Sequence, residues 1–286
     1  VAPQQLPLLR RYELPMLAVW SAADAIIDNG MTPNYVFRLS LRDSLAMPFM
    51  LQTARRRGIL RVGLLLTNTS WGRSNLAAAE RHMLGSREPQ IVANAWFNWQ
   101  EKSLIDRYQK LVAAGAQAIV LIANDDEGAL LVREMAALPP PQRVPVISHW
   151  GVTGGRFAEA AGPALEAVDF SVVQTFSFFT AGPQPLQRFL ATAAQFGVRR
   201  IEDIESPVGV AHAYDMTHIL ARALELAGST DRAAVRDALE QVPLYDGLIK
   251  RYAPPFTRTR HEALDEQQLL MARYRARDGA LIPSET

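Results

Sequence analysis

The chain has 286 residues, of which 49% are hydrophobic, enough to bury one large core or two of medium size. Its 30 basic and 29 acidic residues leave a formal net charge of +1, so charge gives no reason to expect a nucleic acid or an anionic membrane as partner. The lack of cysteine excludes disulfides, thiol catalysis and cysteine-ligated zinc, and no apolar run approaches the roughly 20 residues of a membrane-inserted helix.

Apolar, strand-like runs alternate with amphipathic helical segments up to about residue 180. Because parallel strands need crossover connections, this alternation predicts an α/β fold with mostly parallel sheets flanked by helices. The predicted strands are 16–20, 60–66, 91–96, 118–122, 144–148 and 168–175. The predicted helices between them are 44–57, 72–84, 102–114, which Gly115 ends, 127–138, and a short one from residue 155.

The pattern changes to helices beyond Pro183. The predicted helices are 185–196, 207–227 and 231–241, with a break at residues 228–230 and Thr230 or Asp231 as the N-cap of the last one. A final strand at 269–275 enters a turn at Asp278 and Gly279.

Two loops, Trp20-Ser21-Ala22-Ala23 and Ser148-His149-Trp150-Gly151, lie just beyond apolar strand-like runs. An open α/β sheet collects its ligand-binding groups at the carboxyl ends of its strands. The two loops therefore indicate a binding protein built from two lobes.

Several segments, taken in order and spacing, resemble one family. They are residues 14–23, 35–39, 61–66 followed by Trp71-Gly72, 116–120, and Ala213-Tyr214-Asp215 at the start of a long helix. In these segments the chain resembles the branched-chain amino-acid substrate-binding proteins of ABC transporters, which are similar to the Leu/Ile/Val-binding proteins and have the type I periplasmic-binding fold.

The resemblance implies a two-lobed α/β protein whose hinge is crossed several times, with a ligand held between the lobes. By this likeness the first lobe comprises 1–37 and 179–262, and the second comprises 38–178 and 263–286 together with the hinge strands. Members of the family carry further strand–helix units ahead of the segment that starts here at Val1. The first lobe is therefore expected to lack its N-terminal part.

Ser21, Ala22 and Ala23 are candidate ligand-binding residues, because backbone N–H groups and the Ser21 hydroxyl can bind a carboxylate. In the family the equivalent small-residue loop holds the amino-acid head group. An ordinary turn, with Asp24 or Asp28 as a helix cap, explains the same residues.

Trp71 stands where the family often has an aromatic residue over the ligand, and Gly72 would let the helix N-terminus approach a bound anion. A core tryptophan that closes a strand–helix corner is the alternative. Asn124 and Asp125 follow a predicted strand, so one of them could accept a hydrogen bond from an ammonium group. Asp126 is predicted to cap the next helix.

His149 and Trp150 follow another predicted strand, where Gly151 gives the backbone room to turn. A ligand-binding role and a purely structural role both remain open for them. Bulky residues at 71, 149 and 150 favour an aromatic or otherwise planar ligand over a small aliphatic one.

The sequence predicts no metal site, cofactor or catalytic residue. The five histidines, at 82, 149, 212, 218 and 261, show no metal-binding spacing, and no nucleophile elbow or phosphate-binding loop is present. Asp215 is expected to support structure near the hinge, and the aromatic residues at 96, 97 and 99 to lie in the core or on a lobe surface.

These observations predict a solute-binding protein that captures a small amino acid or a related carboxylate, including aromatic ones, by hinged closure. The resemblance implies delivery to an ABC transporter permease and a periplasmic or extracytoplasmic location, although residues 1–3 do not have the pattern of a signal peptide. A ligand-sensing receptor domain of the same fold is the alternative. An enzyme is the less favoured class.

Overall fold

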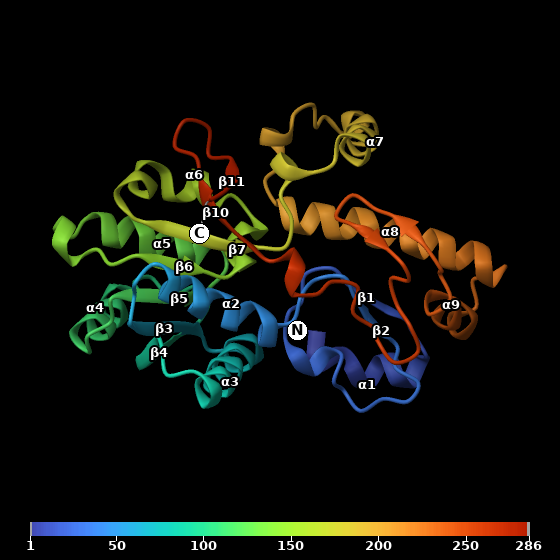
Figure 1. Ribbon diagram of the computed structural model, residues 1–286, viewed down its shortest axis with the longest axis horizontal. Coiled ribbons are helices and arrows are strands. Elements are labelled where there is room, and N and C mark those ends of the chain that lie inside the picture. The colour runs from blue at the N-terminus through green and yellow to red at the C-terminus, as the bar shows by residue number, and fades with distance from the viewer. Residues whose placement is uncertain (1, 285–286) are drawn as a thin grey trace. The chain divides into compact units, whose positions relative to one another are not determined.

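The computed structural model describes residues 2–284, and the chain divides into two compact units (Figure 1). Unit 1 comprises Val1–Arg42, Thr180–Arg199 and Gly209–Gln268, and unit 2 comprises Asp43–Phe179, Arg200–Val208 and Leu269–Thr286. The lobe boundaries expected from the sequence stay a prediction. The units are described one at a time below.

Unit 2 is built on a seven-stranded sheet in the order β11-β10-β7-β6-β5-β3-β4. Five strands, β3 to β7, pair in parallel. Strands β10 and β11 are added antiparallel at the β7 edge. Their bounds are β3 Arg61–Thr67, β4 Gln90–Phe97, β5 Ala118–Ile122, β6 Val146–Ser148, β7 Phe170–Gln174, β10 Leu270–Tyr274 and β11 Leu281–Pro283. The α/β class and the mostly parallel sheet are confirmed.

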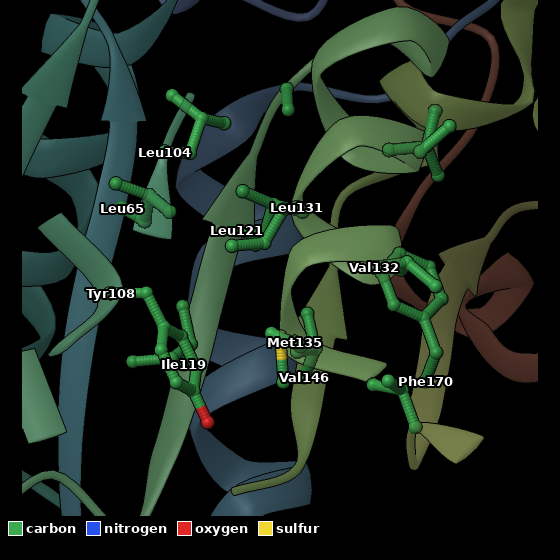
Figure 2. Packing of buried hydrophobic residues seen from close by; sticks show 14 of the residues in the cluster. Leu65, Leu104, Tyr108, Ile119, Leu121, Leu131, Val132, Met135, Val146 and Phe170 are labelled. Carbon is green, nitrogen blue, oxygen red and sulfur yellow. The ribbon is translucent and has the colours of Figure 1, made fainter. Parts of the chain in front are cut away.

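Helices flank this sheet (Figure 1). They are α2 Asp43–Arg56, α3 Ser70–Gly85, α4 Ile105–Ala113, α5 Asp125–Ala136 and α6 Phe157–Ala161. One core cluster packs α4, α5 and α6 onto β3, β5, β6 and β7, and Figure 2 shows Leu131 and Met135 of α5 among the strand residues Leu121 and Val146. Every residue of β5 is buried, as expected for a central parallel strand with both faces covered.

Unit 1 contains two small sheets and four helices among the described residues. Strands β1 Met16–Ala18 and β2 Val36–Arg38 pair in parallel, and β8 Tyr245–Asp246 pairs antiparallel with β9 Arg251–Tyr252. The helices are α1 Ala2–Tyr12, α7 Pro183–Ala193, α8 Pro207–Ala227, whose residues from Gly209 onward belong to this unit, and α9 Arg232–Leu239. Leu9 of α1, Ile26 and Val36 of β2 share a core cluster.

The buried carboxylate of Asp215 in unit 1 is the centre of a hydrogen-bond network. The carboxylate of Asp215 accepts bonds from the backbone N–H groups of Leu248 (2.7 Å) and Ile249 (2.9 Å) and from the hydroxyl of Tyr252 (2.9 Å). Tyr245 adds a longer contact of 3.4 Å. Asp215 therefore fastens the β8–β9 hairpin to α8, which agrees with the structural role expected of it.

Element boundaries show what the sequence pattern missed. Helix α8 and strand β5 have the predicted bounds, and Asp231 caps α9 through Ala233 and Ala234. Helix α1 was not expected, because prolines such as Pro7 disfavour a helix interior. The cap predicted at Asp126 is wrong: α5 begins at Asp125, so Asp126 lies inside the first turn and Asn124 takes the N-cap position.

Candidate functional site

Three of the predicted ligand-binding residues come together beyond the carboxyl ends of β3 and β6, the two strands that flank β5 in the sheet of unit 2. Trp71 follows β3, and His149 and Trp150 follow β6. The ring centroids of Trp71 and His149 lie 5.0 Å apart in an edge-on arrangement, and those of His149 and Trp150 lie 3.9 Å apart. His149 is thus packed between two indole rings, in an aromatic group defined here as Trp71, His149 and Trp150.

Local hydrogen bonds fix the loop that carries His149. Its N–H donates to the carbonyl of Leu121 in β5 at 3.0 Å, which extends the β5–β6 pairing by one residue. The Ser148 hydroxyl donates to the His149 carbonyl at 3.0 Å, and the Thr153 hydroxyl donates to the Trp150 carbonyl at 2.8 Å. These bonds hold the backbone of residues 148–153 at the end of β6 and so fix the position of the imidazole.

Gly151 is required by the same packing. A Cβ at this position would lie 2.3 Å from a Trp71 ring carbon and 2.5 Å from the Ala123 carbonyl oxygen, both closer than real Cβ contacts. The ring of Trp71 therefore lies against the backbone of the loop that follows β6. This contact fits a tryptophan that closes a strand–helix corner, and the side chain as a whole stays partly exposed.

Asp43 is a further residue at this place, and the sequence pattern gave no sign of it. It is the first residue of α2, it is fully buried, and its Oδ1 lies 3.4 Å from Nε2 of His149. The two atoms are close enough for an ion pair but lack hydrogen-bond geometry, since both oxygens of Asp43 and both ring nitrogens of His149 are without a hydrogen-bond partner. A helix-start aspartate reads as a capping residue in a sequence, so only the folded chain reveals this pair.

Other unpaired buried atoms lie in the same unit. They are Thr67 Oγ1 at the end of β3, Asn75 Oδ1 in α3 and Gln174 Oε1 at the end of β7. A buried polar atom without a partner costs roughly 1–3 kcal/mol, so these atoms do not add to the stability of the unit.

Asn124 and Asp125 lie at the N-terminus of α5, after β5. The side chain of Asn124 does not cap the helix. The carboxylate of Asp125 packs against Gly155, where a Cβ would lie 2.1 Å from Oδ2. Burial raises the pKa of the Tyr274 phenol, and the Asp125 charge raises it further, so the Asp125 carboxylate lies near Gly155 and near Tyr274 of β10.

Gly72 has a local explanation. Its N–H donates to the Thr69 hydroxyl at 3.5 Å, and a Cβ would lie 1.9 Å from the Thr67 carbonyl oxygen. The tight start of α3 against the end of β3 therefore accounts for the glycine.

Ser21, Ala22 and Ala23 lie in unit 1, after β1. Their carbonyl oxygens are engaged: the Ser40 hydroxyl donates to Ser21, and the buried guanidinium of Arg38 donates to Ala22 and Ala23 at 3.0 and 2.9 Å. The alternative in which Asp28 caps a helix is not seen, because its carboxylate binds Arg42.

The remaining features that the sequence drew attention to are structural. Phe97 is buried at the end of β4, whereas Trp99 is 48% exposed. Within residues 2–284, no three histidine or acidic side chains gather as a metal site would require. In the same range, no helix is long and apolar enough to cross a membrane.

A sequence profile described as periplasmic binding protein matches residues 4–279. The chain belongs to the periplasmic binding protein family. A search of curated proteins found no match to it. The fold is therefore the two-lobed α/β fold of this family, and the family and its structural neighbours are solute-binding proteins.

Solved structures of the periplasmic binding protein fold are similar to the chain over nearly all of its length. A type 1 periplasmic binding protein from Bordetella pertussis Tohama I has 22% identity and a TM-score of 0.83, covering 99% of this chain and 77% of its own. An ABC-transporter solute-binding protein from R. palustris, in complex with 4-hydroxybenzoate, has 15% identity and a TM-score of 0.80 with coverage of 100% and 74%. A leucine-binding protein from Thermotoga maritima MSB8 has 14% identity and a TM-score of 0.77 with coverage of 98% and 75%.

Proposed function

We propose that the protein captures a small amino acid or a related carboxylate, with aromatic carboxylates as the favoured ligands, and delivers it to an ABC transporter permease. The observation that carries this proposal is the aromatic group Trp71, His149 and Trp150 at the strand ends of unit 2, in a chain of a solute-binding family. Strand ends of this kind are where open α/β sheets bind small molecules.

The planar ring of Trp71 supports the proposal that the ligand is aromatic. Trp71 remains partly exposed, while its ring packs against His149 and Gly151. Because the ring is already fixed, binding of a ligand to it costs little side-chain entropy. Aromatic rings in offset or edge-on contact are worth about 0.5–1.5 kcal/mol beyond the area they bury. The solved relative with bound 4-hydroxybenzoate supports the same ligand class.

We propose that the polar groups of the ligand bind to the loop at residues 21–23 and to the start of α5. Because the carbonyls of Ser21, Ala22 and Ala23 are already hydrogen-bonded, the loop offers the Ser21 hydroxyl and its N–H groups to a carboxylate. Asn124 and Asp125 are proposed to contribute from the start of α5. We propose that binding draws the two lobes together, because a ligand with differential affinity for the closed state shifts the population toward it.

A permease partner and a periplasmic or extracytoplasmic location complete the proposal. Family membership and the transporter relatives support both. A solute-binding protein acts by closing on its ligand, so this function requires no catalytic residue and no cofactor.

Ligand titration tests the proposal. Wild-type protein should be melted in the presence of single amino acids and of aromatic carboxylates, and each hit titrated by calorimetry. A ligand at a hundred times its Kd adds about 2.7 kcal/mol of stability, which a thermal shift detects. Trp71→Ala should weaken binding at least about tenfold, equivalent to about 1.4 kcal/mol, whereas Trp99→Ala, at an exposed tryptophan, should not.

Equal losses in the two variants would remove Trp71 from the site. A clear preference for valine or leucine over every aromatic carboxylate would contradict the favoured ligand class.

A further inference from the structure

Asp43 and His149 form a buried pair whose side-chain oxygens and ring nitrogens have no hydrogen-bond partner. We propose that this pair is the acceptor site for a hydrogen-bond donor on the ligand, a hydroxyl or an ammonium group. The inference rests on the proposed function and adds to it the polar chemistry by which the ligand is selected.

The carboxylate of Asp43 can only accept. An ionised carboxylate has two acceptor oxygens and no donor, and both oxygens of Asp43 are unpaired although the residue is fully buried. A donor from outside the protein's own side chains therefore suits this carboxylate.

His149 supplies the second acceptor. Its Nε2 lies 3.4 Å from Asp43 Oδ1 without hydrogen-bond geometry, and its Nδ1 also has no partner in the protein. In the tautomer with the proton on Nε2, Nδ1 can accept a hydrogen bond. The rings of Trp71 and Trp150 pack on the imidazole and hold its plane. Nδ1 and the carboxylate then present acceptors from one rigid pair.

His261 in unit 1 shows how this chain satisfies a structural histidine. It is also buried, yet its Nδ1 lies 2.8 Å from the Val36 carbonyl and its Nε2 lies 2.9 Å from a Glu240 carboxylate oxygen. A pair with only a structural purpose would be expected to look like His261 and Glu240. The Asp43–His149 pair differs because its hydrogen-bonding capacity is unused.

Matched ligand pairs distinguish the two kinds of donor. Benzoate and 4-hydroxybenzoate differ by one hydroxyl, and 3-phenylpropionate and phenylalanine differ by one ammonium group. Because a hydrogen bond to a charged group is stronger than one between neutral groups, in one of these pairs the donor-bearing ligand should bind at least about tenfold more tightly to the wild type.

Calorimetry on variants then shows which residues cause the tighter binding of the donor-bearing ligand. His149→Phe keeps the aromatic packing and removes Nδ1, and Asp43→Leu replaces the carboxylate with an apolar group of similar shape. Each should bring the ratio of the two affinities close to one while the ligand without the donor keeps its affinity. Asp106→Asn, an exposed acidic residue in the first turn of α4, should leave the ratio unchanged.

Thermal melting of each apo variant shows whether it folds, and if Asp43→Leu does not, His149→Phe carries the test. A ratio near one in the wild type, or one that persists in His149→Phe, would overturn the inference while the proposed function stands. If none of the four ligands binds, the proposed ligand class is wrong and the inference is overturned with it.

Discussion

Among the described residues, buried side-chain atoms without a hydrogen-bond partner occur in unit 2 and not in unit 1. In unit 1, Asp215, Arg38 and His261 are each held by several hydrogen bonds from their own chain. In unit 2, the five residues with unpaired buried side-chain atoms in the described part of the chain lie at or near strand ends and helix starts: Asp43, Thr67, Asn75, His149 and Gln174. Paired groups stabilise a fold, whereas an unpaired buried group costs stability and calls for an explanation. The explanation proposed here is that a ligand supplies the missing bonds at Asp43 and His149.

Removal of Asp215 should give the largest effect on stability. Asp215→Ala leaves the N–H groups of Leu248 and Ile249 and the hydroxyl of Tyr252 without their acceptor inside the protein. We expect the free energy of unfolding to fall by about 3–5 kcal/mol, measured by urea denaturation. Asp246→Ala is the matched control, because its carboxylate makes only an exposed contact with Arg251, and it should change stability by less than about 0.5 kcal/mol. Similar losses in the two variants would contradict the structural role.

Acidification should produce a smaller loss through His212. Burial lowers the pKa of this histidine from 6.5 to about 4, and its Nδ1 lies 2.8 Å from the Val19 carbonyl. Since the unfolded chain binds the proton more readily, stability is lost as the pH falls from about 6.5 toward about 4, by roughly 1–3 kcal/mol. Burial raises the pKa of Asp215, which acts in the opposite direction.

The contribution of His212 is isolated by comparing wild type with His212→Asn in urea denaturation across this pH range. The variant should show the weaker loss of stability on acidification. Parallel pH profiles for the two proteins would exclude His212 as the group responsible.

Removal of a buried hydroxyl that has no partner should give the smallest change in the free energy of unfolding, and this change should be a gain. Thr67→Val removes a buried hydroxyl that has no partner, so the protein should gain about 0.5–1 kcal/mol. Thr53→Val removes a hydroxyl that donates to the Phe49 carbonyl at 2.9 Å and should lose about 1 kcal/mol. Denaturation midpoints at a constant m-value give both numbers, and a loss of stability in Thr67→Val would argue against the distinction between paired and unpaired groups.

Local sequence signals predicted much of the fold. The uniformly apolar run Ala118–Ile122 became a central strand, and the long helix Pro207–Ala227 has its predicted bounds. Helix α1 was missed because Pro7 lies inside it, and the two-residue strands β8 and β9 are too short to leave a periodic pattern. The cap was misplaced at Asp126 because three acidic residues in succession all suit a helix start.

The sequence drew attention to His149, Trp150 and Trp71 because each follows an apolar strand, which is a local signal. The structure brings the three rings together, and their ligand-binding role stays a prediction. Asp43 was missed because its burial beside His149 depends on packing between segments that are about a hundred residues apart in the sequence. Ser21, Ala22, Ala23, Asn124 and Asp125 remain proposals.

A crystal structure of the protein with a bound aromatic carboxylate tests the central claim most directly. We expect the ligand ring against Trp71 and a ligand donor within about 3.2 Å of Asp43 or of Nδ1 of His149. An ordered ligand elsewhere, with no ligand atom within hydrogen-bond distance of Asp43 or His149, would contradict the account.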